Sequence, residues 1–230
     1  MENIIASRKN PLQHQVLDQC IPTKWLGYYK GEAGKRLRMP ESSTLYFLRF
    51  ASDGYHKSPV FNNELANKHK ISSSIHGARK NYFKHLVDYW NEDDLGFEKD
   101  KFPPEKTIYI TLLQENGMHI ATKAGYELAQ PSDKNGFHHL WKASSEFLES
   151  SINERKTVAE LTQKLATRPY KIKQGLIDFW IPTFLFIRRA DFALYENGRF
   201  VPHLNDAVLY MMTKKSESTA LRLLKFREYD

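Results

Sequence analysis

The run at residues 176–187 constrains the fold of this chain most strongly. It reads LIDFWIPTFLFI, and its apolar side chains lie nearly all around a helix axis. A helix that is apolar on most sides is buried on most sides. The run is shorter than the roughly 20 residues that cross a bilayer, and it contains Asp178 and Pro182. We therefore expect a buried helix, kinked at Pro182, in a protein without a membrane span.

The segments around this run have a recognisable order. Residues 157–160, Thr-Val-Ala-Glu, match a helix-capping box, so a short helix is expected to about residue 166. A longer helix over 173–189 follows, and then a hairpin over 194–204 whose turn is Asn197-Gly198. Asn-Gly supplies two residues that tolerate positive φ, as a tight hairpin requires. Helix, turn, longer helix and hairpin is the order of a winged helix-turn-helix.

Three- and four-residue hydrophobic spacing, together with proline, glycine and capping signals, predicts further helices. They are expected over 12–19, 43–52, 59–67, 72–89, 103–116, 140–148 and 205–212. Residues 219–226 are typical of a strand or of a helix end, and residues 117–136 have no regular pattern. We predict a mainly α fold with an irregular basic segment (1–42), a helical domain (43–135) and a winged-helix-like α+β domain (136–230).

The charge is positive and unevenly distributed. The 230 residues carry a formal net charge of +7, with an excess at both ends and a slightly acidic middle. Basic ends permit contact with nucleic acid, although a solvated surface has the same composition. The expected long helix is too apolar to read bases in a groove, so contact with the phosphate backbone is the form left open. The candidate cations are Arg199, Lys214, Lys215, Arg188, Arg189, Lys171, Lys173, Arg79 and Lys80.

No pattern in the chain indicates catalysis. The loop at residues 31–36 differs from a phosphate loop, because Tyr29 stands at its first glycine position and Arg36 where Ser or Thr would hold magnesium. The nine histidines and the acids at 92–100 lack the spacing of a metal site. Cys20 has no cysteine to pair with, which favours a reducing cytoplasm, and no signal peptide is recognised. We expect no catalytic residue, cofactor or metal.

The order of short motifs along the chain resembles a known family. The motifs are Ser58-Pro59, Asn63-Glu64-Leu65, Ser72-Ser73, Ala78-Arg79, Pro103-Pro104-Glu105, and residues 193–198 followed by Phe200-Val201-Pro202. Over residues 43 to 226, this order resembles the region that follows the ATPase module in large P-loop NTPases of prokaryotic phage-defence islands, of the BREX-associated type. In that family the nucleotide is bound by Walker motifs upstream, so the resemblance implies no catalytic residue here. It implies a helical and winged-helix scaffold that contacts a partner protein, the ATPase core or DNA.

The leading expectation is therefore a non-catalytic interaction module of a defence-type NTPase system, located in the cytoplasm and without membrane contact. The alternative is a DNA-binding winged-helix protein that makes non-specific phosphate contacts, and a nuclease is a third possibility. An exposed apolar patch would favour the partner-binding hypothesis. Under the DNA hypothesis, Arg199→Glu should weaken binding without unfolding the chain.

Overall fold

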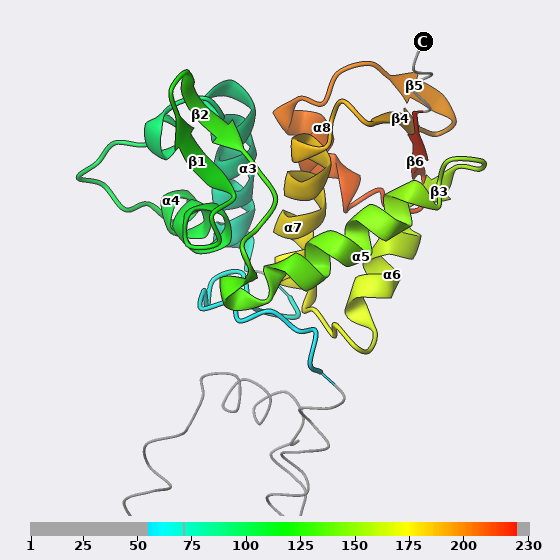
Figure 1. Ribbon diagram of the computed structural model, residues 1–230, viewed down its shortest axis with the longest axis horizontal. Coiled ribbons are helices and arrows are strands. Elements are labelled where there is room, and N and C mark those ends of the chain that lie inside the picture. The colour runs from blue at the N-terminus through cyan, green and yellow to red at the C-terminus, as the bar shows by residue number, and fades with distance from the viewer. Residues whose placement is uncertain (1–54, 71, 225–230) are drawn as a thin grey trace, which may run out of the picture. The chain divides into compact units, whose positions relative to one another are not determined.

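The computed structural model describes residues 55–70 and 72–224 (Figure 1). The described residues from Lys57 onward belong to one compact unit. Several expected features lie outside the described residues: the basic segment at 1–42, the helices over 12–19 and 43–52, Cys20, and the loop at 31–36.

Helix α7 (Gln174–Ile187) lies in the middle of this unit. Every residue from Gly175 to Phe186 is buried, and the helix continues through Pro182. It contacts α3 (Ser73–Asp88), α5 (Phe137–Glu149), α6 (Val158–Ala166) and α8 (Asp206–Met212). Figure 1 shows α7 between α3 on one side and α5 and α6 on the other. The prediction of a buried helix is confirmed, and its packing on several elements explains why no polar face is needed.

Helix α3 buries one face, as its hydrophobic spacing predicts. Ile75, Ala78, Tyr82 and Leu86 are all buried. The hydroxyl of Tyr82 forms a hydrogen bond of 3.0 Å with Thr183 of α7. This bond satisfies both hydroxyl groups inside the core, where an unpaired polar group would be costly.

The hairpin of β1 (His119–Thr122) and β2 (Gly125–Leu128) lies in the segment that we expected to be loose. It follows α4 (Pro104–Tyr109) and the π-helical turn η3 (Ile110–Gln114). Its turn lacks an Asn-Gly pair. Instead, Thr122 accepts a hydrogen bond from the Ala124 amide and donates one to the Gly125 carbonyl. Side-chain bonding of this kind is a weak sequence signal for a turn.

The helix expected over 59–67 is absent, and that prediction is wrong. Residues 58–63 have no regular structure and turns follow them. The Asn63 carboxamide accepts hydrogen bonds from the amides of Leu65 and Ala66 and donates one to Thr111. A side chain bonded to its own backbone two residues on favours a turn over a helix.

The second sheet is antiparallel and has the strand order β3-β6-β4-β5. Its strands are β3 (Lys156–Thr157), β4 (Phe192–Glu196), β5 (Arg199–Val201) and β6 (Thr219–Leu223). The β4–β5 hairpin is confirmed, with φ of 49° at Asn197 and 79° at Gly198. Of the two alternatives for the last segment, the strand is correct. Six helices and two small antiparallel sheets make the described chain an α+β fold.

Local capping signals specify where two of these helices begin. Thr157 caps α6 in a complete capping box with Glu160, as predicted, and the Asn205 side chain caps α8 by accepting from the Val208 amide.

The core is continuous across residue 135, where we expected a domain boundary, because Phe61 packs edge-on against Phe137. The Ser58 hydroxyl also donates to the Tyr170 carbonyl, on the other side of the expected boundary.

Candidate functional site: a groove beside the hairpin

Of the nine candidate cations, Arg79 is placed inside the protein. Its side chain is 1% exposed and forms an ion pair of 3.0 Å with Asp178 of α7. Its guanidinium also donates to the Tyr210 carbonyl. A guanidinium engaged in this way cannot reach a phosphate at the surface, so we omit Arg79 from any nucleic-acid surface.

Two of the three cations at the hairpin end lie beside an acid. Arg199 is exposed and faces Glu196 across the β4–β5 ladder, and Lys215 forms an ion pair with the same Glu196. Lys214 is exposed and donates to the Tyr210 hydroxyl. The carboxylate of Glu196 reduces the positive potential that Arg199 and Lys215 would otherwise offer a phosphate.

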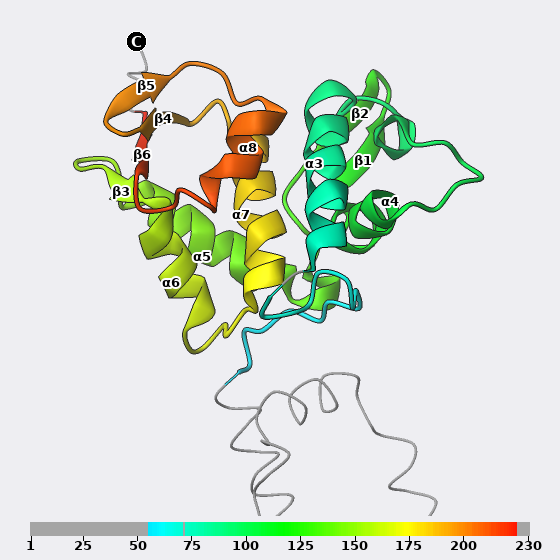
Figure 2. The ribbon, with the colours of Figure 1, turned by 180° about the vertical axis from the view of Figure 1, so that it is seen from behind.

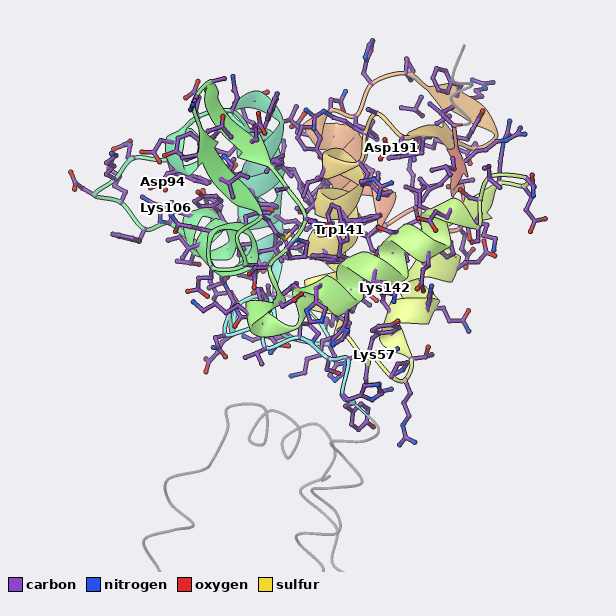
Figure 3. All side chains as sticks on the ribbon, in the orientation of Figure 1. Lys57, Asp94, Lys106, Trp141, Lys142 and Asp191 are labelled. Atoms are coloured by element: carbon purple, nitrogen blue, oxygen red, sulfur yellow. The ribbon has the colours of Figure 1, made fainter. Side chains whose placement is uncertain are left out.

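The paired arginines at the end of α7 have different surroundings. Arg188 is bound to Asp191, which Figure 3 labels just beyond the helix. Arg189 has no carboxylate partner among the described residues, and it donates to the Phe186 carbonyl at 2.9 Å. The bond to a helix-end carbonyl is the role expected for a cation at this position.

The remaining three predicted cations are on the surface at other positions. Lys80 is exposed on α3, and Lys171 is exposed before α7. Lys173 is half-buried at the beginning of α7, with its ammonium 3.4 Å from the Asn67 carbonyl. The nine cations therefore do not form one surface.

A groove of about 350 Å³ lies beside the β4–β5 hairpin. It is bordered by the end of α3, the end of α7, the hairpin and the three residues that follow it. The residues that line it are Val87, Trp90, Phe186, Arg189, Phe192, Leu194, Phe200, Val201, Pro202, His203 and Leu204. Most of these side chains are apolar or aromatic and none is acidic. Phe200, at the rim, is 59% exposed.

Arg189 is the one arginine or lysine that lines the groove. Its guanidinium lies over the Trp90 ring at 4.8 Å and over the Phe186 ring at 4.6 Å. Partial burial lowers the pKa of Arg189, although an arginine stays protonated near neutral pH. Stacking on two rings holds the planar fork in place, and such a fork matches the geometry of a carboxylate. The groove can therefore bind an apolar group that carries a negative charge.

A second polar cluster surrounds the loop that connects α3 to α4. Lys106 is buried and donates to the Glu98 carbonyl at 2.7 Å, and its ammonium lies 3.5 Å from the Asp94 carboxylate. Figure 3 labels Asp94 and Lys106 next to each other. Asp94 and Leu95 both have positive φ, of 52° and 51°, although neither is glycine. Full burial of Leu95 and the contacts of Lys106 hold this strained backbone. We assign the cluster a structural role, because its charged groups are bound to one another.

Within residues 55–70 and 72–224, no group of three or more His, Cys, Asp and Glu side chains is arranged to hold a metal ion. In the same part of the chain, no helix combines the length and apolar character of a transmembrane span.

The groove residues Trp90, Phe186 and Val201 were not among those selected from the sequence. Their apolar character indicates only core packing, and they come together from three separate elements. The adjacent arginines at 188 and 189 were a usable signal, but the sequence alone did not distinguish the paired one from the other. Comparisons of the chain with models of known families, with curated proteins and with solved structures find no match.

Proposed function

We propose that this chain is a non-catalytic interaction module of a prokaryotic defence-type NTPase system. Its groove would bind an apolar, acidic segment of a partner protein or of the ATPase core. The observation that carries the proposal is the groove beside the hairpin, with Arg189 on an aromatic bed and no acid in its lining. Family resemblance along the chain supports the NTPase context.

Charge complementarity selects the occupant. An apolar segment would fill the groove, and its carboxylate would take the place of the acid that Arg189 lacks among the described residues. Charge-assisted contacts between arginine and carboxylate are stronger than neutral hydrogen bonds. Since His203 also lines the groove, its imidazole N–H is a second hydrogen-bond donor for the same segment.

Element order supports a winged-helix-like form for the second half of the unit. Helix α5, strand β3, helices α6 and α7, and the β4–β5 hairpin follow one another as in a winged helix. Strand β6 lies between β3 and β4, so the hairpin occupies the edge of the sheet. In this proposal the β4–β5 hairpin is the wing and forms one wall of the groove, and α7 supports the groove.

Peptide binding tests the groove. The probes are a fluorescein-labelled octapeptide that alternates leucine with glutamate and a neutral version in which glutamine replaces each glutamate. Anisotropy titrations should show at least tenfold tighter binding of the acidic peptide, and Arg189→Gln should remove that preference. Val201→Thr, which adds a hydroxyl at nearly constant volume, should weaken both peptides.

The control is Arg199→Gln, the same chemical change at the hairpin tip outside the groove. It should leave binding unchanged, and thermal melts should show each variant folded. Equal binding of the two peptides, or equal effects of the two arginine variants, would contradict the proposal. The NTPase context is tested separately by the adjoining sequence in the genome, which should encode a Walker motif.

A further inference from the structure

Two stretches of the chain contain cations and no acids. Residues 65–87 hold five Lys or Arg residues, and residues 161–177 hold four. The acids that border them are Glu64, Asp88, Glu160 and Asp178, and Asp178 is buried against Arg79. The chain has 27 Asp and Glu residues in 230, so both acid-free stretches are longer than the average spacing between acids.

The fold brings these two stretches together. The Gly175 amide, in the first turn of α7, donates to the Lys68 carbonyl at 2.8 Å. The Lys173 ammonium reaches the neighbouring Asn67 carbonyl at 3.4 Å. The loop that precedes α3 therefore lies against the segment that precedes α7. Figure 2 shows the two helices beginning at the same end of the unit.

Three exposed lysines lie on these segments: Lys68, Lys70 and Lys171. None of them forms an ion pair with a described residue, whereas Lys99, Lys101 and Lys215 do. The backbone at Lys171 is fixed, because its amide donates to the Thr167 carbonyl at 2.8 Å and Tyr170 and Ile172 on either side are buried. We call Lys68, Lys70 and Lys171 the lysine surface.

Among the described residues, neither stretch holds an exposed large apolar side chain of the kind found in protein interfaces. The exposed large hydrophobic residues of the described chain are Tyr89, Phe102, Ile120, Phe200 and Leu224, and none belongs to either stretch. Protein interfaces have a desolvated core with aromatic residues, and single-stranded nucleic acids are bound through stacking on exposed rings. Contact with duplex DNA requires neither, because phosphate neutralisation supplies non-specific affinity.

We propose that the lysine surface binds the phosphate backbone of duplex DNA without reading its sequence. This surface differs from the groove, since no residue of it lines the groove. It also differs from Lys215 beside the hairpin, which pairs with Glu196, because no described carboxylate forms an ion pair with it. The binding would place the proposed interaction module on DNA while its groove remains free for a protein.

The test measures binding of the full chain to a fluorescein-labelled 30-base-pair duplex by anisotropy over a series of salt concentrations. The variant replaces all three lysines of the lysine surface: Lys68→Gln, Lys70→Gln and Lys171→Gln. Its matched control replaces three exposed lysines elsewhere, Lys99→Gln, Lys101→Gln and Lys123→Gln, with the same change in net charge. Log affinity falls with log salt concentration, and each lysine that contacts a phosphate makes this slope steeper by about 0.9.

At roughly 0.9 per contact, we expect the magnitude of the slope to decrease by about two to three in the lysine-surface variant. The slope should stay unchanged in the control. A second duplex of unrelated sequence should bind equally well. Equal loss in the two variants would show general charge attraction and overturn the proposal. Absence of binding at low salt would overturn it as well, as would tighter binding to phosphatidylserine vesicles than to DNA. Arg189→Gln should leave DNA binding intact, so failure here is distinguishable from failure of the groove.

Discussion

Arg79 of α3 and Asp178 of α7 form an ion pair inside the protein, with 3.0 Å between Nη1 and Oδ2. Gln174 donates to the same carboxylate, and the Arg79 guanidinium stacks on the Tyr210 ring of α8 at 4.5 Å. One buried arginine thus connects three helices. Ion pairing and hydrogen bonds satisfy Asp178 and the two terminal guanidinium nitrogens, whereas the buried Nε of Arg79 has no hydrogen-bond partner among the described residues.

Removing one partner of this pair should be strongly destabilising. We expect Arg79→Met to lower the free energy of unfolding by about 3–5 kcal/mol, because Asp178 is left buried and unpaired. The double variant Arg79→Met with Asp178→Leu should recover much of that loss. Urea denaturation measures all three proteins. If the double variant is no more stable than the single one, the ion pair is not the cause of the loss.

The capping box at the start of α6 should contribute to stability in a pH-dependent way. Thr157→Ala should cost about 1 kcal/mol, whereas Thr157→Ser, which keeps the hydroxyl, should cost much less. Hydrogen bonding from the Thr157 amide lowers the pKa of Glu160. The contribution of Glu160 is therefore complete above the unfolded pKa of about 4.3 and is lost as the pH falls through the lower folded value.

Urea denaturation at pH 7 and at a series of pH values below 4 measures both effects. The stability difference between wild type and Glu160→Gln, which removes the charge and keeps the side-chain length, should shrink as the pH falls. A difference that stays constant across this range would contradict the role of the Glu160 carboxylate.

His119 should make the protein less stable in acid. Its Nε2 lies 3.0 Å from the Trp90 carbonyl, which can only accept, so the neutral ring donates there and Nδ1 accepts from the Tyr109 hydroxyl at 3.0 Å. Burial lowers the pKa of His119. The unfolded state therefore binds its proton first, at about pH 6.5, and stability falls from that pH down to the folded pKa.

Unfolding by urea at pH 7.5 and 5.5 should show a larger loss in wild type than in His119→Gln. Because other histidines titrate in the same range, the difference between the two proteins is the informative quantity. An NMR titration that gives His119 a pKa above 6.5 would contradict this prediction.

Two glycines should respond to alanine in opposite ways. Gly77 is exposed in α3 with no atom within 4 Å of an added Cβ, so Gly77→Ala should raise stability by about 0.5–1 kcal/mol through helix propensity. Gly96 has φ of +68°, and an added Cβ would lie 2.9 Å from Cγ of Tyr89. Gly96→Ala should therefore lower the melting temperature and Gly77→Ala should raise it. Thermal denaturation of both variants checks the signs, and the same direction in both would be inconsistent with the backbone conformations described.

The positions of most described helices could be predicted because their signals are local. A capping residue, a proline in the first turn and apolar spacing are all encoded within a few residues, as at Thr157 and Pro104. The hairpin of β1 and β2 could not be predicted, since its turn depends on Thr122 and its position on distant contacts. These are contacts with Tyr109 of α4 and with Trp90 and Asn91, which follow α3. The wrong helix at 59–67 has a local and a distant cause. Asn63 accepts from the amides of Leu65 and Ala66, and it also donates to Thr111, which is distant in the sequence.

Sequence by itself determined a buried helix at 176–187, a hairpin with an Asn-Gly turn and an excess of cations. Tertiary structure decided what the cations do. It buried Arg79 against Asp178, paired Arg188 with Asp191, and left Arg189 on two aromatic rings without a described acid. The fold decides whether a charge meets its partner, whether that partner is near in the sequence, as Asp191 is to Arg188, or far, as Asp178 is to Arg79. Electrostatic attraction depends on distance and on burial.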